Sequence, residues 1–288
     1  MRLCVMIEGQ EGVTWEDWLA LARACEEQGY DALFRSDHYG PVVAADEPGS
    51  LDAWATLAGL AAVTSTLRLG TLVSPATFRH PSVLAKSAVT VDHISGGRVE
   101  VGMGAGWNRA EHERYGFPFP PTRERMDVFA EQLEVVHRQW SDEPFSFEGR
   151  HYRLADSDPR PKPVQAPHPP LIVGGSGGKR SVALAARWAD EYNAVSPTPE
   201  ECRALKERIA EACAGEGRES LPLSVMTGLI RDPDEAIRQL SELAEAGVER
   251  VCSSTWSTRT STCSVSWPRK SPRSCASAAT PKWGRFDR

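Results

Sequence analysis

The stretch RLGTLVSPATFRHPSVLAKSAVTVDHISGGRVEVGMGAGWN, residues 68–108, contains a strand, a helix and a second strand in succession. Residues 67–73 are short and mostly apolar, which predicts a strand, and a turn follows at Pro75. Residues 80–94 have the apolar spacing of a helix, and residues 99–103 predict the next strand. Short apolar strands that alternate with helices favour a parallel sheet covered on both faces.

The same alternation continues on both sides of this stretch. The helix at 14–29 begins at Thr14, with Asp17 as a capping-box-like partner. The other predicted strands are 3–7, 31–35, 171–173, 191–195, 221–230 and one that begins at 248–251. The other predicted helices are 51–64, 122–140, 181–188, 199–214 and 234–246. Eight such units in a chain of 288 residues predict an α/β fold of the (β/α)8 TIM-barrel type, with function at the carboxyl ends of the strands.

Composition narrows the class of protein. The chain is 41% hydrophobic and 25% charged, with a net charge of −6, so nothing favours nucleic acid or an anionic membrane surface. No apolar run is long enough to cross a bilayer, and the N-terminus has no cleavable signal pattern, so we expect a cytoplasmic protein. The seven cysteines form no CxxC pair, so neither a metal site nor a redox pair is expected.

Two segments depart from the repeating pattern. Residues 144–170 are rich in proline and polar residues, and we expect an insertion with a small hairpin and an extended return that could cover the substrate. From Cys252 onward the sequence shows no helical spacing of apolar residues, and Asp287 is its only acidic residue. We therefore divide the chain into a barrel at 1–251 and an aberrant tail at 252–288, and we expect the last strand and helix to be disrupted.

A reading-frame shift at Val251 is our hypothesis for this tail. A GC-rich back-translation with one base restored reads VMLQHLVHEDLDML, which supplies the missing strand and helix. A disordered basic tail is the alternative. Sequencing the gene across Val251 distinguishes the two.

Candidate catalytic side chains follow the first two strands. SDHY, residues 36–39, ends the second strand, and a histidine beside an aspartate at a barrel mouth is well placed for proton transfer. His38 and Asp37 are therefore candidates, with Glu8 at the end of the first strand as an acid/base group or a polar rim residue.

Glycine-rich turns follow three later strands. Gly70 and Thr71 would place backbone amides and a hydroxyl at the mouth, and VGMGAGWN adds Gly104, Gly106 and the amide of Asn108. GGSGGKR opens a helix, where backbone N–H groups bind anions, and especially phosphate. Its candidates are Gly174, Gly175, Ser176, Gly177 and Gly178. Together these turns outline one ligand with a phosphate tail and a flat polar head.

Three segments resemble the luciferase-like monooxygenase superfamily, in particular its F420-dependent oxidoreductase branch. They are FRSDHY, the run from RLGTLVSP to EHERYGFPFPP, and LIVGGSGGKRSVALAARWADEYN. The resemblance implies a deazaflavin or flavin at the mouth of a TIM barrel, above a bulged third strand that sometimes has a non-prolyl cis peptide. Gly70, Thr71 and Leu72 would form that bulge, and Gly104 and Gly106 would let the backbone lie close to the cofactor.

The resemblance also implies a reaction. His38 would assist hydride transfer between coenzyme F420 and a small organic substrate, Asn108 would bond the head or ribityl chain, and residues 174–178 would hold the phosphate. An FMN-dependent monooxygenase is the first alternative, and a non-catalytic or inactive truncated barrel is the second. A homodimer is expected by analogy alone.

Overall fold

A computed structural model of the protein describes residues 1–42 and 49–255. Its strands are β1 (Arg2–Ile7), β2 (Ala32–Arg35), β3 (Arg68–Pro75), β4 (Val99–Gly104), β5 (Phe145–Glu148), β6 (Arg153–Ser157), β7 (Leu171–Gly174), β8 (Glu191–Val195), β9 (Leu223–Gly228) and β10 (Arg250–Thr255). Its helices are α1 (Trp15–Gln28), α2 (Ala53–Val63), α3 (Pro81–Ser95), α4 (Arg109–Tyr115), α5 (Thr122–Trp140), α6 (Lys179–Trp188), α7 (Pro199–Gly215) and α8 (Pro233–Glu245).

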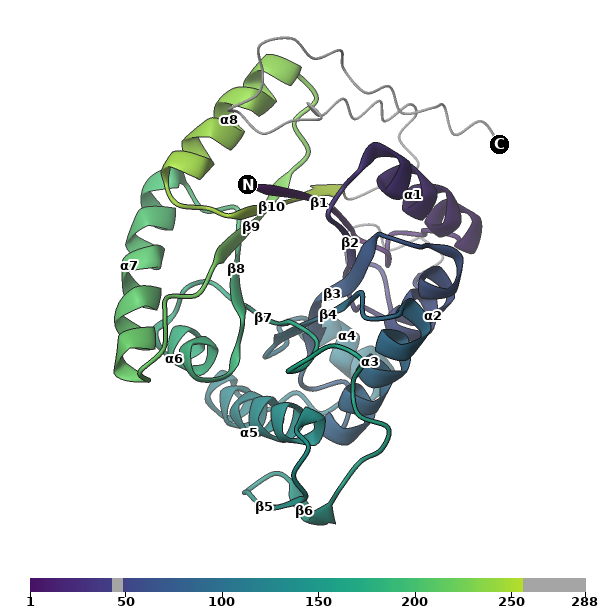
Figure 1. Ribbon diagram of the computed structural model, residues 1–288, viewed down its shortest axis with the longest axis vertical. Helices are drawn as coiled ribbons and strands as arrows, with labels where there is room; N and C mark the ends of the chain where they lie inside the picture. Colours follow the sequence, from purple (N-terminus) through teal and green to yellow (C-terminus); the bar gives the residue numbers. More distant parts are fainter. Residues whose placement is uncertain (43–48, 256–288) are drawn as a thin grey trace.

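The predicted barrel is present. All strands but β5 and β6 form a closed parallel barrel in the order β1-β10-β9-β8-β7-β4-β3-β2, and helices surround it (Figure 1). One apolar core lies between strands and helices, and a smaller one that includes Cys4, Met6 and Phe34 fills the barrel interior. Alternation along each strand separates the two cores, since Val5 and Ile7 belong to the outer one. Among the described residues, no helix has the length and apolar character to span a membrane.

The expectation of a disrupted last strand is wrong. β10 pairs with β1 and with β9, and its register with β1 runs from Arg250 opposite Arg2 to Thr255 opposite Ile7. A strand held on both sides receives its hydrogen bonds through the backbone, so the small residues Cys252 and Ser253 can follow Val251 without an apolar run. Residues 252–255 are thus part of the barrel, while the expected closing helix lies outside the described residues. The frame shift stays a prediction.

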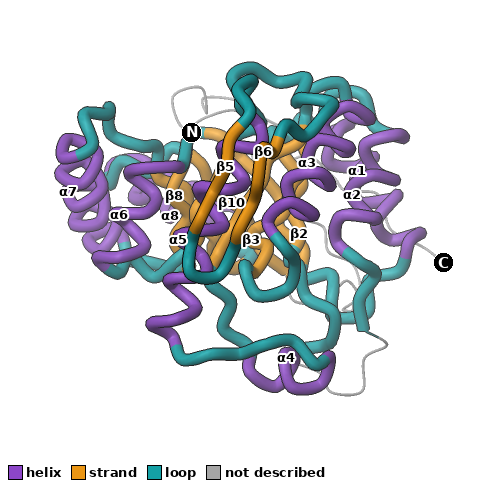
Figure 2. The backbone as a smooth tube through the Cα atoms, turned by 90° about the horizontal axis from the view of Figure 1, so that it is seen from below, coloured by secondary structure: helices purple, strands orange, loops and turns teal. Residues whose placement is uncertain are grey.

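The insertion at 144–170 contains the predicted hairpin, formed by β5 and β6, but it is not a lid over the mouth. Figure 2 shows the hairpin on the outside of the barrel, with α4 at one end of the molecule. The extended return lies toward the other end: Gln165 donates to the carbonyl of Val99, where β4 begins, and accepts from Arg68, where β3 begins. Asp92 accepts hydrogen bonds from the backbone amides of Val164 and Gln165, which fixes the return against α3.

Candidate functional site

A cavity of about 750 Å³ opens at the carboxyl ends of the barrel strands. Ten of the predicted site residues line it: Glu8, His38, Leu72, Gly104, Gly106, Asn108, Gly174, Gly175, Ser176 and Gly178. The strand ends therefore gather most of the predicted residues around one space. Four of the predicted site residues are not among those that line it: Asp37, Gly70, Thr71 and Gly177.

His38 forms an ion pair with Glu111, which the sequence analysis missed. The Nδ1 of His38 lies 2.6 Å from Oε2 of Glu111, and the Glu111 side chain is 2% exposed. The other carboxylate oxygen of Glu111 accepts hydrogen bonds from the backbone amides of Tyr39 and Gly40, at 2.5 and 3.3 Å. Because Nδ1 is engaged, Nε2 is the ring nitrogen of His38 that a ligand in the cavity can reach.

The charge of Glu111 changes the protonation of His38. Burial lowers the pKa of His38, but the hydrogen bond and charge of Glu111, with the charges of Glu8 and Asp37, outweigh it and hold that pKa above its usual value. Burial likewise raises the pKa of Glu111, but the hydrogen bond and charge of His38, with the hydrogen bonds from the amides of Tyr39 and Gly40, outweigh it and lower that pKa. The pair therefore favours a protonated imidazole beside an ionised carboxylate.

Glu111 was missed because α4 was missed. The helix has only seven residues, too few to show an apolar period. Its start does carry a signal: Asn108 is the N-cap and Glu111 is the third helical residue, the spacing of a capping box. The Oδ1 of Asn108 accepts from the Glu111 amide, so the side-chain NH2 of Asn108 is the part left for a ligand.

The third strand is bulged, one step later than predicted. Its register with β4 shifts between Thr71 and Ser74, and the Leu72–Val73 peptide is cis. Gly70 instead pairs regularly opposite Glu100, while Thr71 donates from Oγ1 to the carbonyl of Gly102. The bulge pushes Leu72 and Val73 toward the cavity, where both line it.

The glycines of β4 and β7 accommodate this bulge. A Cβ on Gly104 would lie 2.7 Å from Cγ2 of Val73, and a Cβ on Gly174 would lie 2.8 Å from Cγ1 of the same side chain. Gly106 has a φ of +79° in the turn after β4. The space beside Gly104 is thus filled by Val73, so the missing side chain of Gly104 admits the bulge. Gly104 also lines the cavity, and a close approach of its backbone to a cofactor stays a prediction.

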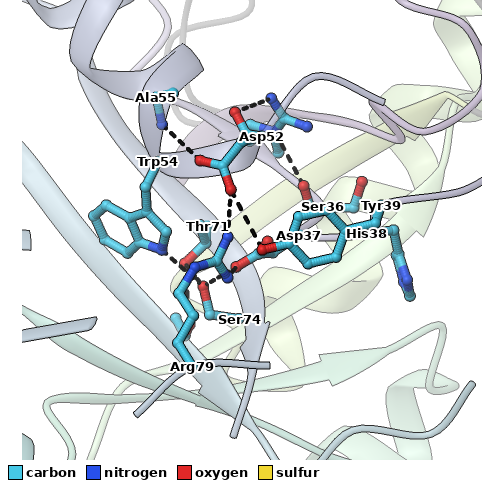
Figure 3. A network of polar contacts seen from close by, with 12 residues as sticks. Ser36, Asp37, His38, Tyr39, Asp52, Trp54, Ala55, Thr71, Ser74 and Arg79 are labelled. Carbon is cyan, nitrogen blue, oxygen red and sulfur yellow. Dashed lines mark hydrogen bonds and ion pairs between the residues drawn. The ribbon is translucent and has the colours of Figure 1, made fainter. Parts of the chain in front are cut away.

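Asp37 supports the site from behind. Its Oδ2 accepts from Ser74 Oγ at 2.6 Å and from Arg79 Nη1 at 2.5 Å, and it is 1% exposed (Figure 3). Arg79 also reaches Asp52 at 2.7 Å, and the His38 ring points away from this network. Asp37 therefore ties the second strand end to the bulged strand instead of contacting the cavity.

Glu8 is held by its neighbours at the end of β1. Its Oε2 accepts from Nε2 of Gln10 at 2.8 Å, and Gln10 in turn accepts from Ser36 Oγ. These bonds orient a carboxylate that lines the cavity and is 6% exposed.

The loop between β7 and α6 forms a cradle suited to an anion. The amides of Gly175 and Gly177 are used within the protein, by the carbonyl of Asn193 and the hydroxyl of Tyr192. Gly178 is the N-cap of α6 and gives no side-chain cap, so the first amides of the helix remain for a ligand. Lys179 lines the cavity beside them, and Arg180 also does so while it pairs with Asp127. A flat ring over the bulge with a phosphate on this helix start fits the donors present.

Comparisons with known proteins identify the family of this chain. Residues 3–252 match the luciferase-like monooxygenase family. The F420-dependent glucose-6-phosphate dehydrogenase of Kineococcus radiotolerans is 31% identical over 74% of this chain and 64% of its own length. The FMNH2-dependent dimethylsulfone monooxygenase of Pseudomonas putida is 31% identical over 67% of this chain and 53% of its own.

A solved structure has the same fold. The F420-dependent secondary alcohol dehydrogenase in complex with an F420-acetone adduct superposes with a TM-score of 0.79 at 20% identity. The match covers 88% of this chain and 92% of that one.

Proposed function

The chain belongs to the luciferase-like monooxygenase family and is an oxidoreductase of that family, and we propose that it transfers a hydride between coenzyme F420 and a small organic substrate. The observation that carries the proposal is the single cavity where the open helix start of α6, the bulged strand and His38 converge. F420-dependent relatives support this choice of cofactor, and an FMN-dependent relative at the same identity makes monooxygenation the second candidate.

Different residues would bind different parts of the cofactor. The first amides of α6 and Ser176 would hold a phosphate, and Leu72 and Val73 would support the ring. The side-chain NH2 of Asn108 would donate to the ring or the ribityl chain. When bound, the deazaflavin supplies a carbon that gives or takes a hydride.

His38 would donate the proton that the substrate oxygen needs. Its Nε2 faces the cavity with a proton when the imidazole is charged, so it can donate to a substrate oxygen as hydride arrives at the neighbouring carbon. Glu111 fixes the ring and stabilises that charge, which makes it a positioning residue.

Parallel fluorescence titrations with F420 and FMN test the cofactor. Gly178→Asp sharpens them: aspartate is a favoured N-cap, so the fold is kept, but its carboxylate occupies the amides that a phosphate needs. We expect tight F420 binding that weakens at least about tenfold in Gly178→Asp. Gly178→Ala is the matched control and should retain binding, because the nearest atom to an added Cβ, Ser181 Oγ, lies 4.0 Å away and the methyl group carries no charge to compete with a phosphate.

Each other outcome has a meaning. A preference for FMN would replace hydride transfer with oxygen activation. Binding of neither cofactor would contradict both candidates and favour a non-catalytic barrel.

A further inference from the structure

Two large apolar side chains lie exposed at the rim of the cavity. Trp107 is 64% exposed and Val195 is 60% exposed, and both line the cavity. Exposed apolar surface at the mouth of a pocket is typical of a ligand-binding wall.

Trp107 contacts the proton donor, and Val195 lies across the barrel mouth from it. The ring of Trp107 meets that of His38 edge-on, with the centroids 5.8 Å apart. Val195 ends β8, which lies directly across the barrel from β2, since three strands separate them in either direction. A substrate that reaches Nε2 of His38 is therefore beside the indole, with Val195 on the opposite wall of the cavity.

The charges around the cavity are unevenly placed. Within residues 1–42 and 49–255, the lysine and arginine side chains that line the cavity are Lys179 and Arg180, both at the start of α6. The carboxylates of Glu8 and Glu111 lie on the His38 side. A substrate phosphate there would be desolvated beside acidic groups, at a large cost in free energy.

We propose that the substrate is an uncharged carbonyl compound with an aromatic or bulky alkyl group, held between Trp107 and Val195, and not a sugar phosphate. This inference rests on the proposed hydride transfer. The carbonyl carbon accepts a hydride from the reduced deazaflavin, the carbon–oxygen π bond breaks, and the oxygen takes a proton from Nε2 of His38. The products are an alcohol and the oxidised cofactor, whose second hydrogen leaves to solvent as a proton, and His38 takes a proton back from solvent.

Binding of matched ketones to the F420-loaded full chain tests this proposal by calorimetry. The probes are acetophenone, 4-acetylbenzoate and 4-acetylphenyl phosphate, which share the reacting group and differ in charge. We expect acetophenone to bind at least about tenfold more tightly than either anion. Equal or tighter binding of an anion, or no binding of acetophenone, would overturn the proposal.

Variants of Trp107 and Val195 test whether acetophenone binds at the rim of the cavity. Trp107→Ala should weaken acetophenone binding by about tenfold, and Trp107→Phe should restore most of it because a ring is kept. Val195→Ala should weaken it less, by about threefold. Val63→Ala is the matched control, since Val63 is 49% exposed on α2 and does not line the cavity. Unchanged binding in Trp107→Ala would contradict the assignment.

The same samples separate this inference from the proposed function. An F420 titration precedes each ketone titration. If F420 does not bind, the proposed function fails. If F420 binds and glucose 6-phosphate is oxidised in preference to reduction of acetophenone, only the substrate inference fails.

Discussion

At the scale of single residues, the site depends on the carboxylate of Glu111, which stabilises the protonated ring of His38. Glu111 is buried and accepts hydrogen bonds from His38, Tyr39 and Gly40, so it is fixed before any ligand arrives. A group preorganised in this way does not have to reorient during the reaction. The protonation state of His38 is therefore set mainly by one neighbour.

Glu111→Gln should shift the pH dependence of carbonyl reduction. The reaction needs protonated His38, and loss of the carboxylate lowers the pKa of His38, so activity should fall off at a lower pH than in the parent protein. Initial rates measured across the pH range check this. Glu113→Gln is the matched control, because Glu113 is on the same helix but exposed in a pair with Arg109. An unshifted alkaline limb in Glu111→Gln would remove the role given to the pair.

Stability should depend on pH through the same histidine. The pKa of His38 is raised in the folded protein, so its contribution to the free energy of unfolding is complete below the unfolded value near 6.5. That contribution is lost as the pH rises through the folded pKa. Urea unfolding at a series of pH values should show this loss in the parent protein and a flatter profile in His38→Gln.

The sequence predicted which strand ends contribute to the site, but not the direction of every side chain there. His38 and Glu8 follow strand ends, where a parallel barrel places side chains at the mouth, and both line the cavity. Asp37 follows the end of β2, as His38 does, but its side chain faces Ser74 and Arg79. Contacts with these distant residues set its direction, and the local sequence does not show them.

At the scale of elements, the bulge in β3 shapes the cavity and depends on glycines in neighbouring strands. Its extra residues bring Val73 against Gly104 and Gly174, which belong to β4 and β7. Three strands thus share one packing arrangement under the cavity.

Gly104→Ala should weaken cofactor binding by about tenfold, because the new methyl group would lie 2.7 Å from Val73 and overpacking costs about 1–3 kcal/mol. Val73→Ala in the same chain removes the clash and should restore part of the affinity. F420 titrations of the single and double variants measure both effects. Gly215→Ala is the control, since no atom lies within 4 Å of its added Cβ. Equal loss in single and double variants would show that the glycine does not act through Val73.

Elements with a long period were predictable, and short or irregular ones were not. The predicted helix at 122–140 has the observed bounds of α5, since nineteen residues show their apolar spacing clearly. The seven residues of α4 are too few to show an apolar spacing. The position of the bulge depends on how β3 pairs with β4, so the sequence of β3 alone does not predict it.

At the scale of the whole molecule, closure of the barrel was the feature hardest to foresee. The sequence after Val251 lacks an apolar run, which led to the wrong expectation of a disrupted strand. The structure places an ion network at the amino end of the barrel, where Arg250 of β10 lies 2.6 Å from Glu100 of β4 and 3.4 Å from Glu191 of β8. The predicted start of the eighth strand, 248–251, includes Arg250, where β10 begins, but the partners of Arg250 come from distant parts of the chain.

Arg250→Met should destabilise the fold by about 3 kcal/mol, the lower end of the cost of breaking a buried pair, because buried Glu100 then keeps Arg68 as a partner but loses Arg250. The side chains of Arg250 and Glu100 are only 2% and 1% exposed, so solvent cannot replace the lost contact. Arg238→Met is the control: Arg238 is 69% exposed in a surface pair on α8 and should change stability by less than about 0.5 kcal/mol. The free energy of unfolding in urea measures both.

The Arg250 network lies at the end of the barrel opposite the cavity, which separates stability from binding. Folded Arg250→Met protein should therefore bind F420 with nearly the parental affinity. Adding Glu100→Gln should recover part of the lost stability, since the buried charge is removed with its partner. If the single variant loses less than about 1 kcal/mol, closure of the barrel rests on the backbone pairing of β10 with β1 and β9 and not on this network.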